Sequence, residues 1–65
     1  MTLTERNMEI LTLLAAGLED LEIAQELYIS PKTVKSHVAA VRRKFDARNR
    51  THVVALAYQA GVLEV

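Results

Sequence analysis

The sequence contains no cysteine, one proline and two glycines, and its formal net charge is zero. Without cysteine, neither a disulfide framework nor a thiolate metal site can support the fold. No apolar run approaches the length of a membrane span and no signal peptide is evident, so we expect a cytoplasmic domain. The glycines, Gly17 and Gly61, are far apart, which excludes a glycine-rich phosphate loop, and each is typical of a helix end.

What the chain does contain is aliphatic residues at helical spacing. Its 65 residues, 51% of them hydrophobic, allow one small domain near the lower size limit for unassisted folding. Strand-like alternation, internal repeats and linkers are all missing from the sequence. We therefore predict an all-α fold, a four-helix bundle in which the second and third helices form a helix-turn-helix and a fourth helix follows.

The zero net charge conceals a strong segregation of charge along the chain. Seven of the eight Lys and Arg residues lie between Lys32 and Arg50, where Asp46 is the one acid, so this window carries a formal charge of +6. The rest of the chain holds Arg6 against seven acids, a formal charge of −6. Such segregation favours a basic face directed at a polyanion, although a solvated basic surface would give the same count.

Capping residues and apolar spacing give approximate helix bounds of 4–16, 20–27, 31–45 and 50–60. Thr4 and Asn49 are good N-caps, and Ser30 followed by Pro31 is a strong start signal for the third helix. The third helix should bury one narrow stripe, made of Val34, Val38, Val41 and Phe45. The apolar set of the fourth helix is too wide for one buried stripe, so we expect part of it to form a partner surface.

Two helices joined by a tight turn, the second with a polar face, describe a helix-turn-helix. Tyr28-Ile29-Ser30 can form that turn, and Lys35 and Ser36 lie on the exposed face in the first two turns of the third helix. Lysine can donate to guanine and serine can donate or accept, so both suit base edges in a major groove. The alternative is an ordinary surface helix with lysines for solubility, and the pattern favours DNA binding over it.

From Leu3 to Gly61 the chain resembles the LuxR-type helix-turn-helix domain, the effector module of bacterial response regulators and quorum-sensing regulators. The run from Ile29 to Val38, together with Glu22-Ile23-Ala24, is the most specific part. The other matching residues are Leu3-Thr4-Glu5-Arg6, Ile10-Leu11, Leu14-Ala15, Gly17-Leu18, Leu27, Arg43-Lys44 and Asn49-Arg50-Thr51.

The resemblance implies that residues 1–65 are one domain of a longer transcription regulator, for example in a two-component system. Its partner would be double-stranded promoter DNA, with RNA polymerase as a further partner. We expect the domain to be no enzyme and to need no cofactor, metal or small-molecule ligand. The third helix would enter the major groove, with Lys35, Ser36, Ala39 and Lys32 toward bases and Thr33, His37, Arg43, Lys44 and Arg50 toward the backbone. The fourth helix would supply a homodimer contact, for which we expect Val53, Leu56 and Ala60.

The chain departs from the family pattern at three places. Where the family usually has Ser-Asn-Lys-Glu, this chain has the run Glu19 to Glu22, which lacks the basic residue and would repel phosphate. Asn7 replaces the usual glutamate of the first capping box, which we expect to weaken that cap. Ala39 replaces a polar side chain that could read a base, leaving apolar contact with a thymine methyl. Modest DNA affinity is therefore expected.

Other functions remain as alternatives with less support. An enzyme is disfavoured because Ser36 and His37 are neighbours in a helix, where side chains diverge by about 100° and cannot pair as nucleophile and base. A protein-binding surface around Glu19, Asp20 and Leu21 is the main competitor, motivated by the missing lysine and neutral charge. A sigma-factor promoter-reading domain has similar helices, but the motif run fits the LuxR type better.

Overall fold

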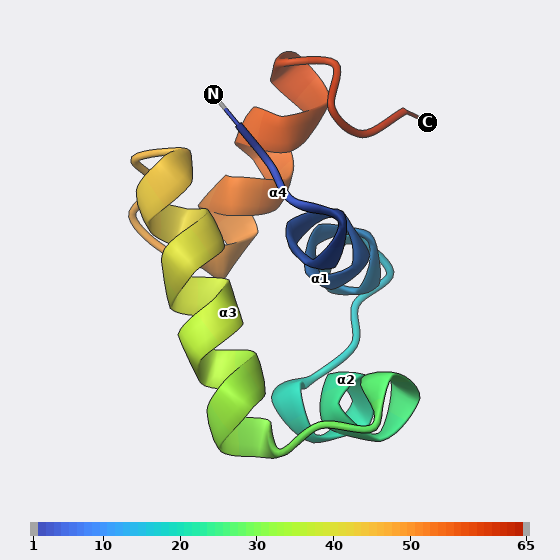
Figure 1. Ribbon diagram of the computed structural model, residues 1–65. Helices are drawn as coiled ribbons and strands as arrows, with labels where there is room; N and C mark the ends of the chain where they lie inside the picture. The colour runs from blue at the N-terminus through green and yellow to red at the C-terminus, as the bar shows by residue number, and fades with distance from the viewer. Residues whose placement is uncertain (1, 65) are drawn as a thin grey trace.

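The computed structural model describes residues 2–64, and over that range it consists of four helices without strands. The helices are α1 (Glu5–Ala15), α2 (Asp20–Leu27), α3 (Pro31–Lys44) and α4 (Arg50–Gln59). In Figure 1, α3 runs along the left of the view, α4 lies beside its upper end, α1 lies to its right, and α2 lies at the lower right. The predicted all-α architecture is confirmed, with helix bounds within a residue or two of those expected from the sequence.

The first helix begins at a complete capping box. The Thr4 hydroxyl accepts a hydrogen bond from the Asn7 backbone N–H at 3.0 Å, and the Asn7 side-chain oxygen accepts from the Thr4 N–H at 3.1 Å. Asn7 is also buried, at 6% exposure. The expectation that Asn7 weakens this cap is therefore wrong, because its shorter amide still reaches the cap when the residue is held against the core.

The turn between α2 and α3 depends on one residue with a left-handed backbone. Tyr28 has φ 57° and ψ 43° while its side chain is 94% exposed. Its N–H and that of Ile29 both bond to the Ala24 carbonyl, which closes the last turn of α2. Ser30 then accepts from the Thr33 N–H at 3.0 Å and begins α3. The turn is thus as short as a helix-turn-helix requires.

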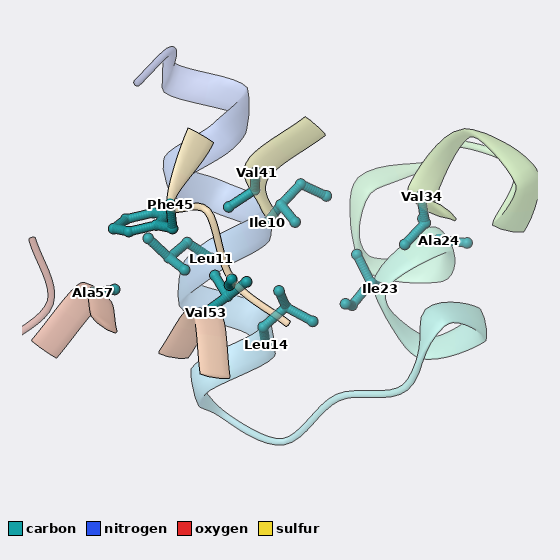
Figure 2. Packing of buried hydrophobic residues seen from close by; sticks show 11 residues of the cluster. Ile10, Leu11, Leu14, Ile23, Ala24, Val34, Val41, Phe45, Val53 and Ala57 are labelled. Atoms are coloured by element: carbon teal, nitrogen blue, oxygen red, sulfur yellow. The ribbon is translucent and has the colours of Figure 1, made fainter. Parts of the chain in front are cut away.

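The core gathers side chains from all four helices (Figure 2). One part lies between α1, α3 and α4, and Ile23, Ala24 and Val34 fill the place where α2 meets α3. The predicted stripe on α3 is confirmed for Val34, Val41 and Phe45, and Val38 is partly buried against them. The fully buried large side chains are Ile10, Leu11, Ile23, Val34, Val41 and Val53.

Val53 requires a correction. It was expected at a dimer surface, but it has 0% exposure and belongs to the hydrophobic core. The reason is the phase of α4: Val53 and Ala57, four residues apart, share the face that meets α1 and α3. A fully enclosed side chain has no surface to offer a second subunit.

Candidate nucleic-acid interface

The exposed face of α3 carries the residues expected to read bases. Lys32, Lys35 and Ser36 are exposed and Ala39 is partly exposed. At about 100° per residue they lie opposite Val34 and Val41, which are fully buried and fix the rotation of the helix. The core therefore determines which side chains of α3 face outward.

Thr33, His37 and Lys44, the residues expected along the groove wall, lie on one flank of α3. The hydroxyl of Thr33 lies 2.8 Å from that of Ser30, within the helix cap, and His37 is half-buried. Lys44 is exposed, and its Nζ donates to the Thr2 carbonyl at 2.7 Å. Lys44 therefore ties the segment before α1 to the C-terminal end of α3, a contact with no signal in the sequence.

Two arginines at the end of α3 have different surroundings. The Arg42 guanidinium lies 3.4 Å from the Ala47 carbonyl oxygen and 3.5 Å from that of Arg48, so it points at the loop that leads to α4. Asp46, with φ 53°, turns the chain there, and Ala47 is buried. Arg43 is exposed, with no recorded side-chain hydrogen bond within residues 2–64. Of the pair, Arg43 is the one free to meet an external anion.

Arg50 was expected at the DNA backbone, and the structure shows it engaged within the domain. Its Nη1 lies 2.7 Å from the Asp20 carboxylate, and its Nη2 donates to the Leu18 carbonyl at 3.3 Å. The two side chains are 37% and 24% exposed, respectively. This pair joins the first residue of α2 to the first residue of α4. Thirty positions separate the partners, so sequence periodicity gave no signal for it.

The acids at the start of α2 are largely used locally. The Glu22 carboxylate accepts from the Glu19 backbone N–H at 2.8 Å. Asp20 is paired with Arg50. The carboxylates place negative charge at the N-terminus of α2, where a phosphate would otherwise be favoured. Leu21, the apolar residue of the run, is 60% exposed.

The exposed apolar residues of α4 do not share one face. Tyr58, 41% exposed, points away from the face that holds Val53 and Ala57, whereas Leu56 is half-buried at the edge of that face and Ala60 is exposed at the helix end. A groove of about 490 Å³ runs between the end of α1 and the start of α4, with Leu18, Arg50 and Val54 among its lining residues. The apolar residues of α4 are thus divided between the core and partly exposed positions.

The two histidines do not form a site. His37 lies on α3, while His52 lies in the first turn of α4, where its Nδ1 accepts from the Arg48 backbone N–H at 3.0 Å. Within residues 2–64 no three His, Cys, Asp or Glu side chains converge as metal ligands. Over the same range, every helix is too short or too polar to cross a bilayer.

Comparison with known proteins places this arrangement in a family. The model of the luxR family of bacterial regulatory proteins matches residues 1–57, which contain all of α1, α2 and α3. The chain belongs to the luxR family. Among curated relatives, the response regulator protein VraR of Staphylococcus aureus is 44% identical over 62 residues, covering 95% of this chain and 30% of VraR. This luxR-type domain therefore spans about a third of the length of the relatives it matches.

Two solved structures have the same fold. The response regulator ChrA of a heme-sensing two-component system superposes with a TM-score of 0.92 at 35% identity, over 97% of this chain and 31% of ChrA. VqmA from Vibrio cholerae, solved with ligand and DNA, superposes with a TM-score of 0.89 at 38% identity, over 94% of this chain and 27% of VqmA. The helix-turn-helix assignment made from the sequence is confirmed.

Proposed function

We propose that this luxR-type domain binds double-stranded promoter DNA in a sequence-specific manner and thereby regulates bacterial transcription, with α3 in the major groove. The observation that carries the proposal is the exposed face of α3, where Lys32 and Lys35 have no recorded side-chain partner within residues 2–64. The DNA complex of VqmA, a protein with the same fold, supports the same partner for this chain.

The positions of the side chains suggest how contacts divide between bases and phosphates. Lys35 and Ser36 lie in the first half of α3, the part of a recognition helix that contacts base edges, with Lys32 and Ala39 beside them. Arg43 and Lys44, one or two turns further on, would meet phosphates, and Thr33 and His37 would line the groove wall. Lys44 would exchange its bond to the Thr2 carbonyl for one to phosphate.

A homodimer is the second part of the proposal. Two copies joined through α4 would place two α3 helices on half-sites about one helical turn apart. With Val53 in the core, Leu56 and Ala60, which lie four residues apart on one side of α4, remain as contact residues. A longer regulator that contains this domain and is bound to promoter DNA would be placed to contact RNA polymerase. The similarity to the response regulators VraR and ChrA supports a regulator of a two-component system.

The experiment is a titration of the domain against DNA selected from a random pool, over a range of salt concentrations. With two to four charged contacts per domain, the binding constant should fall with log–log slope of roughly −2 to −4, about 10- to 150-fold between ~50 and ~200 mM salt. Random DNA of equal length serves as the control and should bind more weakly. Absence of binding at the lowest salt would refute the proposed function.

A further inference from the structure

The Asp20–Arg50 ion pair offers more than a link between two helices. Asp20 is the first residue of α2 and Arg50 the first residue of α4, and their side chains meet at 2.7 Å. The Leu18 carbonyl accepts from the other terminal nitrogen of the same guanidinium at 3.3 Å. Both terminal nitrogens of Arg50 are therefore used inside the domain, where a free arginine would present a two-pronged donor to a phosphate.

Other cations in the basic segment are held differently. Lys32, Lys35 and Arg43 are exposed and have no recorded side-chain partner within residues 2–64. The Nζ of Lys44 meets a neutral backbone carbonyl, which leaves its charge uncompensated. Within the same range, Arg50 is the one cation of this segment whose charge is matched by a carboxylate. The Asp20 carboxylate thus compensates one positive charge of the basic segment that is proposed to face DNA.

We propose that Asp20 limits DNA affinity by sequestering Arg50, so that removing the Asp20 carboxylate releases Arg50 to contact a DNA phosphate. This inference rests on the proposed DNA binding and goes beyond it by naming the residue that sets its strength. Asp20 acts here as a positioning residue: it controls Arg50 and contacts no DNA itself. With one more phosphate contact, the binding constant depends on the salt concentration more steeply, by a power of about −0.9. At ~0.1 M salt this contact strengthens binding roughly eightfold relative to ~1 M salt.

The test compares variants of the whole 65-residue chain on one DNA selected with the unmodified protein. Asp20→Ala should bind roughly five- to tenfold more tightly at ~0.1 M salt, and its salt slope should be steeper by about 0.9. The advantage should shrink about threefold between ~50 and ~200 mM salt, since that extra contact is ionic. Asp20→Asn keeps the shape with a weaker acceptor and should show a smaller gain in the same direction.

The matched control is Glu26→Ala. Glu26 is an exposed acid of the same helix with no ion pair recorded within residues 2–64, so this variant removes an equal charge without freeing an arginine. Its gain should stay below about twofold, with an unchanged slope. The double variant Asp20→Ala with Arg50→Gln should lose the gain, because the released guanidinium is gone. Circular dichroism of each variant verifies that the helices persist.

Three results separate the possible failures. If the unmodified domain binds no DNA, the proposed function itself is wrong. If it binds DNA and folded Asp20→Ala and Asp20→Asn bind no more tightly, the sequestration of Arg50 is refuted while DNA binding stands. Equal gains in Asp20→Ala and Glu26→Ala, or a gain that survives Arg50→Gln, would also overturn the proposal, since both point to general charge repulsion.

Discussion

Val53→Ala separates the two roles assigned to that residue, core side chain and dimer contact. The substitution removes two methyl groups from a side chain with 0% exposure. At about 0.8 kcal/mol per buried carbon, the lost transfer free energy is roughly 1.6 kcal/mol, and the cavity left behind adds up to about 1 kcal/mol. The expected loss is therefore about 1.6–2.6 kcal/mol, out of a total unfolding free energy of roughly 3–10 kcal/mol for a domain of this size.

Urea unfolding followed by circular dichroism measures this loss as a lower midpoint at an unchanged slope. The loss should not depend on protein concentration, since a core contact is made within one chain. Gln59→Ala, at the exposed last residue of α4 and outside the proposed dimer contact, is the control and should change the unfolding free energy by less than about 0.5 kcal/mol. If Val53→Ala matched that control, the core assignment would be refuted, and an effect that disappeared on dilution would assign Val53 to a subunit interface instead.

Two further predictions concern α2 and the turn after it. Leu21→Lys introduces, at a 60%-exposed position, the basic residue that the family usually has there. The variant should bind DNA several-fold more tightly, with a salt slope steeper by about 0.9. An unchanged slope, measured by fluorescence anisotropy, would place this end of α2 away from phosphate. Tyr28→Gly should stabilise the domain by about 0.5–1 kcal/mol because glycine adopts the left-handed conformation at φ 57° without the cost of a side chain. Tyr28→Ala, which keeps a Cβ, should give no such gain in thermal unfolding, and equal melting temperatures for the two variants would argue against backbone strain there.

Helix positions and the recognition face could be predicted because both follow from local rules. Ser30 and Pro31 begin α3 where the sequence indicates, since a cap needs only residues within one turn. The 3.6-residue period then places Val34 and Val41 inside and Lys35 outside. Asn7 is the local exception: its amide caps α1 as a glutamate would, because burial holds it close.

Contacts between distant parts of the chain could not be predicted from periodicity. Arg50 meets Asp20 across thirty positions, and Lys44 meets the Thr2 carbonyl across forty-two. Val53 was assigned to the wrong side of α4 because apolar residues surround that helix on most faces, so the pattern does not fix its rotation. The packing of α4 against α1 and α3 is what fixes it.

The central claim, that the first half of α3 reads DNA sequence, is tested most directly by comparing Lys35→Ala with Arg43→Ala on selected and random DNA. Both residues are exposed cations of α3, about two helical turns apart. Lys35→Ala should weaken binding to selected DNA by about 1–3 kcal/mol and relax the preference at one base position, with little change on random DNA. Arg43→Ala should weaken both about equally. Equal losses on both DNAs for Lys35→Ala would contradict base reading by Lys35 and reassign it to phosphate.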